Sequence, residues 1–165
     1  MIIEYVTTEF GVKSPTRSNP SDAGLDIYAH LREPAELISG ENKMIPTGLR
    51  FGIPHGYMLQ VCNRSSMGAK RSLIVGAHII DSGYDGEVFI DLHNIGMDTQ
   101  VIHDGDKIAQ LVLVPVIHFR PRKALSTNLY DNQGLTISDR GHGALGSTDT
   151  KENIHPLNDV PVGGF

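Results

Sequence analysis

The sequence contains little cysteine, no long apolar run and no excess of positive charge. Cys62 is the single cysteine among 165 residues, which excludes an intramolecular disulfide framework and a cysteine-clustered zinc site and is typical of a reducing compartment. No apolar run approaches the roughly 20 residues of a membrane span, and the first residues lack the basic flank of a signal peptide. These absences predict a soluble protein of the cytoplasm, or of the host cytoplasm if the chain is viral, without membrane contact.

The charge balance limits the kinds of partner. A net charge of −5 at pH 7 and a sequence pI near 5.8 argue against a broad surface for nucleic acid or anionic membranes. We therefore expect no direct nucleic acid binding, and any phosphate that the protein handles should be on a small molecule. The 8 histidines are scattered without metal-ligand spacing, so they predict no transition-metal site.

The composition favours an all-β fold. The 18 glycines and 9 prolines, with few long helical patterns, indicate many short strands joined by tight turns. The expected strands cover 2–6, 25–29, 44–53, 57–63, 86–94 and 107–116, a spacing that suits a barrel or jelly roll. A single short helix, opened by a serine cap, is expected over 65–72. From 126 onward the apolar content falls, which predicts a barrel domain over 1–125 and an extended C-terminal arm over 126–165.

Three polar segments stand out, although each also has an ordinary structural explanation. Residues 63–66 combine a guanidinium, two hydroxyls and the free N–H groups of a helix start, which suits phosphate oxygens but equally a capped helix. Residues 80–86 read as a hairpin turn that would also project a carboxylate and an aromatic ring. Residues 140–148 form a glycine-rich run that could nest an anion or be a flexible tail.

Five segments in a fixed order are more specific evidence of a protein family than any one of them alone. Residues 21–29, 64–66, 76–86, 105–116 and 140–148 together resemble the five motifs of the trimeric deoxyuridine triphosphatases (dUTPases), in sequence and at that family's spacing. The resemblance spans about residues 1–149, most of the chain. It implies a β-clip subunit, a distorted jelly-roll barrel, assembled as a homotrimer with three sites at subunit interfaces. The implied reaction is magnesium-dependent hydrolysis of dUTP to dUMP and pyrophosphate, which limits uracil incorporation into DNA and supplies dUMP for thymidylate synthesis.

The resemblance also implies roles for individual residues. Asp81 matches the catalytic carboxylate that activates the attacking water, and Asp26 matches a carboxylate that lies near the water shell of Mg²⁺. Substrate-binding roles fall on Arg64, Ser65, Ser66, Ala77, His78, Ile80, Tyr84, Phe89, Gln110, Arg140, Leu145, Gly146 and Ser147. Within this set, Tyr84 would pack on the deoxyribose, Gln110 would contact the phosphates, and Arg140 would meet the γ-phosphate. The backbone around Ala77, His78 and Phe89 would read the uracil edge.

Two departures from the dUTPase pattern leave alternatives open. Arg64-Ser65-Ser66 and Ala77-His78 are similar to the related dCTP deaminases, which carry a glutamate where Asp91 stands. A dCTP deaminase, or a bifunctional deaminase and dUTPase, is therefore one alternative. The fifth motif has Leu145 where an aromatic residue normally stacks on uracil. A regulatory protein that binds dUTP without catalysis is the other alternative, although the intact Asp81 argues against a loss of activity.

Overall fold

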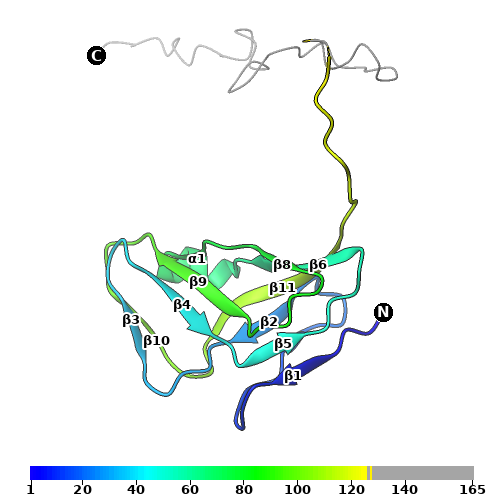
Figure 1. The fold of residues 1–165 in the computed structure, drawn as a ribbon. Helices are drawn as coiled ribbons and strands as arrows, with labels where there is room; N and C mark the ends of the chain where they lie inside the picture. The colour runs from blue at the N-terminus through cyan, green and yellow to red at the C-terminus, as the bar shows by residue number, and fades with distance from the viewer. Residues whose placement is uncertain (126, 128–165) are drawn as a thin grey trace, which may run out of the picture. The chain divides into compact units, whose positions relative to one another are not determined.

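Short antiparallel strands make up most of the chain, as expected for an all-β protein. The computed structural model describes residues 1–125 and 127, and Met1–Phe119 form one unit (Figure 1). Its strands are β1 (Tyr5–Thr7), β2 (Leu25–Tyr28), β3 (Ala35–Leu37), β4 (Asn42–Pro46), β5 (Leu49–Phe51), β6 (Tyr57–Cys62), β7 (Leu73–Val75), β8 (Ile79–Asp81), β9 (Phe89–Asn94), β10 (Gln100–Ile102) and β11 (Lys107–Pro115), with one helix in the described part, α1 (Ser65–Arg71).

Four sheets arrange these strands. The largest has the order β2-β11-β6-β8, the second β4-β9-β7, and two further pairs are β1-β5 and β3-β10. All pairings are antiparallel. Strand neighbours are mostly distant in sequence, which is the topology of a distorted jelly roll rather than of successive hairpins. The predicted fold class is confirmed.

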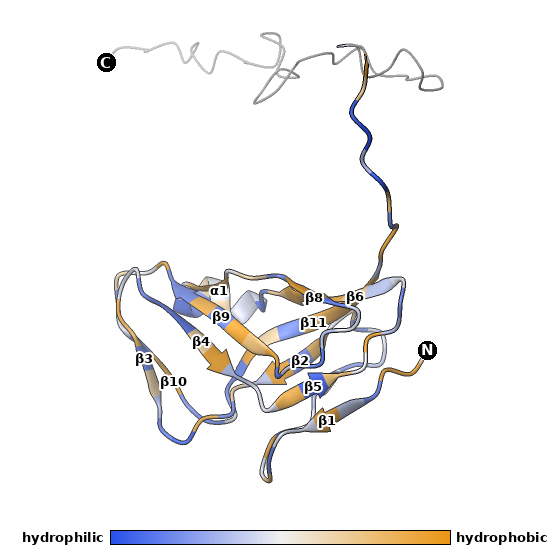
Figure 2. Cartoon of the chain, in the orientation of Figure 1, coloured by the Kyte–Doolittle hydropathy of each residue, from blue (hydrophilic) through white to orange (hydrophobic). Residues whose placement is uncertain are grey.

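A single apolar core joins the sheets. The core is formed by alternate side chains of the strands. In β9, for example, Ile90 and Leu92 are buried while Phe89 is exposed. Much of β4, β9 and β11 carries the hydrophobic colour in Figure 2. Each fully buried Ile or Leu contributes about 1.5–3 kcal/mol relative to exposure. The largest fully buried apolar side chains are Ile27, Leu37, Ile45, Leu49, Leu73, Ile90, Leu92, Ile102, Ile108 and Leu111.

The strand predicted over 44–53 is interrupted. Gly48 has φ +67°, a conformation that favours glycine, and it turns the chain from β4 into β5 of another sheet. The buried Thr47 fixes this turn, since its hydroxyl donates to the Val88 carbonyl (2.7 Å) and accepts from the Leu49 N–H (3.2 Å). The turn is thereby tied to the segment that leads into β9.

The helix occurs where the sequence predicts it, but without the predicted serine cap. Its N-cap is Arg64, in extended conformation and with no side-chain cap bond. It ends at Ser72, which has φ +52° and donates its N–H to the Gly68 carbonyl (3.1 Å). Met67 anchors the helix in the core. Among residues 1–125 and 127, no helix has the length and apolarity needed to cross a lipid bilayer.

The hairpin predicted at residues 80–86 is wrong. Strand β8 contains Asp81 and pairs with β6, whereas β9 pairs with β4 and β7. The intervening residues therefore connect two sheets rather than two adjacent strands. Asp81 is the last residue of a paired strand, opposite Met58, which gives its backbone a fixed position.

Candidate active site

The candidate residues of the barrel gather mainly in two pockets that share no lining residue. The first, called the Arg64 pocket, has a volume of about 310 Å³ and is lined by Ser18, Asp22, Ala23, Gly24, Asp26, Arg64, Ser65 and Gln110. The second, called the Asp81 pocket, has a volume of about 240 Å³ and is lined by Met44, Ala77, Ile79, Ile80, Asp81, Tyr84, Glu87, Val88 and Phe89.

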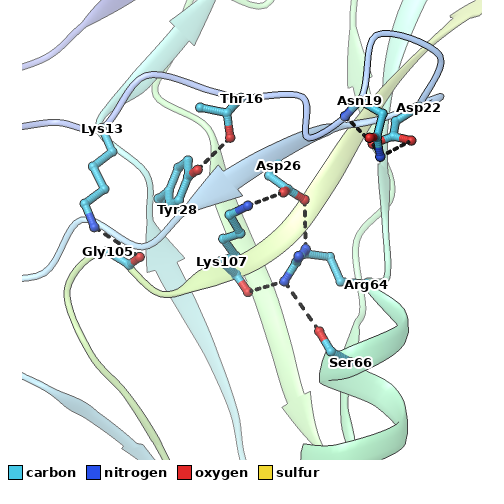
Figure 3. Close-up of polar contacts among 10 residues, drawn as sticks. All are labelled: Lys13, Thr16, Asn19, Asp22, Asp26, Tyr28, Arg64, Ser66, Gly105 and Lys107. Atoms are coloured by element: carbon cyan, nitrogen blue, oxygen red, sulfur yellow. Dashed lines mark hydrogen bonds and ion pairs between the residues drawn. The ribbon is translucent and has the colours of Figure 1, made fainter.

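In the Arg64 pocket, one carboxylate is held by two cations (Figure 3). Arg64 Nε lies 2.8 Å from Asp26 Oδ1, and Lys107 Nζ lies 2.7 Å from Asp26 Oδ2. Arg64 Nη1 contacts the Lys107 carbonyl (3.4 Å) and the Ser66 hydroxyl (3.5 Å). Among the described residues Nη2 has no hydrogen-bond partner, so the guanidinium is fixed on one side and available on the other. Fixed guanidinium donors of this kind suit phosphate oxygens.

The two cations keep Asp26 ionised. Partial burial alone would raise its pKa, but the hydrogen bonds from Lys107 and Arg64 outweigh burial, so the pKa lies below its ordinary value. The same contact with Asp26 raises the pKa of Lys107. Asp26 is therefore an anion that orients Arg64.

Gly24 and Gln110 form one side of the Arg64 pocket. A Cβ at Gly24 would lie 3.0 Å from Gln110 Cβ and closer still to Gln110 Oε1, so a larger residue here would have to displace the Gln110 side chain. Gln110 Nε2 donates to the Asn63 carbonyl (2.9 Å), and Asn63 Oδ1 accepts the N–H of Val75 (2.6 Å). Asn63 thus links β11 to β7.

A tight turn places the polar groups of the Asp81 pocket. The Tyr84 N–H donates to the Asp81 carbonyl (3.2 Å), and Gly83 between them has φ +87°. The Ser82 hydroxyl donates to the Ile53 carbonyl (3.1 Å), which ties the turn to the barrel. Carboxylate and aromatic ring are therefore presented from one anchored element.

The ring of Tyr84 is held although it is 47% exposed. Its hydroxyl donates to the Glu87 carbonyl (2.8 Å), and a Cβ at Gly86 would lie 2.4 Å from the hydroxyl oxygen. The Glu87 carboxylate accepts the N–H of Gly48 (2.8 Å). The ring is thus available as a flat apolar surface in a defined orientation.

The backbone at Ala77 is also available. Among the described residues, no protein group bonds to its N–H or carbonyl. The neighbouring His78 is engaged differently, because its carbonyl accepts the Val61 N–H (2.8 Å) and its Nδ1 lies 2.9 Å from the Val61 carbonyl. Ala77 is therefore suited to hydrogen-bond a polar ligand edge, whereas His78 anchors the segment to β6.

Strand register separates the two pockets within one chain. Asp26 lies opposite Gln110, which lies opposite Cys62, while Asp81 lies opposite Met58. Three strand spacings across the sheet are about 14 Å, and the four residues from Cys62 to Met58 add about 13 Å along it. The two carboxylate-bearing residues are therefore on the order of 20 Å apart.

The structure thus divides the residues expected from the sequence. Asp26, Arg64, Ser65 and Gln110 line one pocket, and Ala77, Ile80, Asp81, Tyr84 and Phe89 line the other. Ser66 and His78 line neither. Arg140, Leu145, Gly146, Ser147 and the predicted arm lie outside the described residues.

Several lining residues were not expected from the sequence. Asp22, Ala23 and Gly24 belong to the same motif as Asp26, so their proximity along the chain was a usable signal. Met44 carried no such signal, because it reaches the Asp81 pocket only through the pairing of β4 with β9.

The arrangement does not provide a closed protein metal site. Within the described part of the chain, no group of three or more His, Cys, Asp or Glu side chains could hold a metal ion. Both oxygens of Asp26 already accept from cations. The residues therefore fit a magnesium ion only if phosphate oxygens and water supply its ligands, with Asp26 at most facing that water.

The fold and site define an all-β, jelly-roll protein with a guanidinium pocket and a separate carboxylate pocket. A family model described as dUTPase matches residues 11–148. This chain belongs to the dUTPase family. The deoxyuridine 5'-triphosphate nucleotidohydrolase of Chlamydia pneumoniae is 36% identical over 146 residues, which cover 87% of this chain and 96% of that protein. The enzyme of the same name from Chlamydia felis is 34% identical over 149 residues, or 89% of this chain and 98% of that protein.

Solved structures are similar as well. The dUTPase of phage phi11 of S. aureus has a TM-score of 0.71 at 25% identity, covering 76% of this chain and 97% of that one. A mutant of the Staphylococcus bacteriophage 80alpha dUTPase with bound dUpNHpp has a TM-score of 0.77 at 24% identity, covering 89% and 98%, and supports the fold. A mutant of the phi11 enzyme is described as coordinating a structural Mg(II) ion (TM-score 0.70, 25% identity, covering 76% and 98%).

Proposed function

We propose that this protein hydrolyses dUTP to dUMP and pyrophosphate. The observation that carries the proposal is the Asp81 pocket, where a carboxylate, an oriented aromatic ring and an unpaired backbone segment at Ala77 converge in a chain of the dUTPase family. The reaction breaks the bond between the α-phosphorus and the oxygen that bridges to the β-phosphorus. Water supplies the new oxygen on dUMP, and its proton needs an acceptor.

Asp81 is the proposed acceptor of that proton. Its position at the end of β8 fits a general base, since such a group must hold water in line with the phosphorus. Ala77 and Phe89 would present backbone groups to the uracil edge, with Ile80 beside them, and Tyr84 would pack on the deoxyribose. His78 supports this edge through its anchor on Val61.

Arg64, Ser65, Ser66 and Gln110 are the proposed phosphate contacts. The available face of the Arg64 guanidinium and the hydroxyl of Ser65 in the pocket wall support this assignment. Magnesium would arrive on the triphosphate, with its remaining positions filled by water, and would neutralise charge on the phosphates. Asp26 would orient Arg64 and face that water as an outer-shell group.

A homotrimer is the proposed active form. The strand register separates Asp81 from Asp26, the partner of Arg64, by about 20 Å, which favours a site that takes the two pockets from different subunits. Pairing the Asp81 pocket of one subunit with the Arg64 pocket of the next would complete a site. Arg140, Leu145, Gly146 and Ser147, on the proposed arm that follows the barrel, would add the γ-phosphate contact and a cover for the base. The cytoplasm is the proposed location, in keeping with the single cysteine.

Product analysis tests the function. Purified protein with Mg²⁺ should convert dUTP to dUMP and pyrophosphate, and dCTP should release no ammonia, because Asp91 replaces the deaminase glutamate and is engaged by Asn42 and His93. Chromatography of nucleotides with pyrophosphate and ammonia assays checks both points. Ammonia from dCTP at a rate comparable to dUTP hydrolysis would favour the deaminase alternative, and nucleotide binding without product would favour the regulatory one.

Tyr84 should contribute to sugar selection. Removing the ring in Tyr84→Ala opens space where a 2'-hydroxyl would lie, so the ratio of kcat/KM for UTP to that for dUTP should rise by about tenfold. Steady-state assays with both nucleotides measure this ratio. Tyr84→Phe is the matched control, since it keeps the ring and loses only the bond to Glu87. An unchanged ratio in Tyr84→Ala would assign sugar discrimination to another residue.

A further inference from the structure

A carboxylate–imidazole pair borders the Asp81 pocket and has no role in the reaction proposed above. Asp91 Oδ2 lies 3.0 Å from His93 Nε2, and Asp91 Oδ1 accepts from Asn42 Nδ2 (3.0 Å). Asp91 and His93 are two residues apart on β9, so their side chains share its outer face. Both oxygens of the carboxylate are held, and the Asp91 side chain is only 18% exposed.

The start of the segment between β7 and β8 rests directly on this pair. A Cβ at Gly76 would lie 2.2 Å from His93 Nε2 and 2.4 Å from Asp91 Oδ2. Gly76 is outside the left-handed region, so a larger residue here would be opposed by contact with the ends of the Asp91 and His93 side chains rather than by backbone conformation. The Gly76 N–H also donates to the Asp91 carbonyl (2.8 Å). The pair and the strand that carries it therefore determine where this backbone lies.

The same backbone leads into the pocket. Ala77 follows Gly76 and lines the pocket, and its N–H and carbonyl have no partner within the described residues. Met44, which is opposite Asp91 in the register, and Phe89, on the same face of β9, line the pocket too. Ala77 thus lies between two hydrogen-bonded residues. On one side the Gly76 N–H donates to the Asp91 carbonyl, and on the other the His78 carbonyl accepts the Val61 N–H of β6.

We propose that Asp91 and His93 are positioning residues that fix the backbone at Gly76 and Ala77 and thereby set the affinity of the Asp81 pocket for the nucleobase. The inference rests on the proposed function, because it takes uracil as the occupant. Backbone hydrogen bonds weaken steeply with angle, so a small shift of Ala77 would reduce recognition of the base. Burial by itself would raise the pKa of Asp91, but the hydrogen bonds from Asn42 and His93 outweigh burial. The pKa therefore lies below its ordinary value, and the carboxylate stays ionised.

Kinetics of three variants test the inference. Asp91→Asn and His93→Phe should each raise the KM for dUTP and the Kd for dUMP by about tenfold, as expected for one lost charge-assisted hydrogen bond, with kcat within about threefold. His93→Gln should restore most of the affinity, because its amide nitrogen can donate to Asp91. Asp98→Asn, an exposed acid four residues after Asn94, is the control. A fall in kcat at unchanged KM in Asp91→Asn would overturn the inference.

A double-mutant cycle tests the contact at Gly76. Gly76→Ala should raise the Kd for dUMP by about tenfold, because its methyl group displaces the segment. In an Asp91→Ala/His93→Ala background the same change should have a much smaller effect, since both side chains that the methyl group meets are gone. Equal effects in the two backgrounds would contradict the proposed contact.

Hydrogen exchange separates this inference from the proposed function. In Asp91→Asn and His93→Phe, the amides of Gly76 and Val61, which donate to the Asp91 and His78 carbonyls, should exchange about tenfold faster than in the Asp98→Asn control, while the other amides of the core strands keep their protection. If the wild-type protein neither binds dUMP nor hydrolyses dUTP, the proposed function fails, and the exchange rates still decide the positioning claim. Unchanged exchange in both variants would overturn it.

Discussion

Asp81→Asn is expected to lower the kcat for dUTP by about 10²-fold or more while the affinity for the nucleotide is kept. The amide preserves the shape of the carboxylate but cannot accept the proton of the attacking water. The paired position opposite Met58 should hold the substituted side chain in place. Rapid-mix pyrophosphate release measures the chemical step, and calorimetry with a non-hydrolysable dUTP analogue measures binding.

Asp85→Asn is the matched control for this experiment. Asp85 lies four residues further on the same connection, is highly exposed, and does not line the Asp81 pocket. Its carboxylate pairs with Arg50, and a surface pair of this kind contributes about 0–1 kcal/mol. The control should keep near wild-type kcat. If Asp81→Asn also kept it, Asp81 would have no part in the chemistry.

The second large effect is recovery of activity from two inactive proteins. Asp81→Asn and Arg64→Gln should each be nearly inactive, the second because a neutral amide replaces the guanidinium that holds phosphate. Mixed under conditions that exchange subunits, equal amounts should recover about a quarter of wild-type activity if each site takes Asp81 and Arg64 from different chains of a ring. Lys107 should keep Asp26 paired in the Arg64 variant.

A double variant supplies the control for the mixing experiment. Chains carrying both substitutions, mixed equally with wild-type chains, should leave about a quarter of the sites intact if sites are shared and about half if each site belongs to one chain. Subunit exchange is verified by native mass spectrometry of a tagged protein. No recovery in the first mixture together with half activity in the second would show that each site is built from a single chain.

Local periodicity in the sequence predicted much of the barrel. The strand predicted over 86–94 contains β9, where Ile90 and Leu92 are buried, and this could be predicted because a strand presents alternate side chains to opposite faces regardless of its partners. The helix at 65–71 was also predicted, since its pattern is local. The ordered motifs predicted the family, which the family model confirms.

Strand pairing could not be predicted in the same way. The prediction of a hairpin at 80–86 failed because β8 pairs with β6 and β9 with β4 and β7, and such long-range choices depend on total burial rather than on turn residues. Strand β7, which carries the segment on which Ala77 lies, was too short for its pattern to stand out. Met44 was also missed, because it reaches the Asp81 pocket only through the long-range pairing of β4 with β9.

By itself the sequence determined the all-β class, the short helix at 65–71, the dUTPase family and most of the candidate residues, because composition, periodicity and motif order are properties of the chain alone. Only the tertiary structure decided how those residues group. It brought Asp26 to Arg64 and Lys107, 38 and 81 residues away, and set Asp81 in a separate pocket. It also laid Gly76 on Asp91 and His93. Contacts between distant segments follow from the packing of sheets, which no local pattern records.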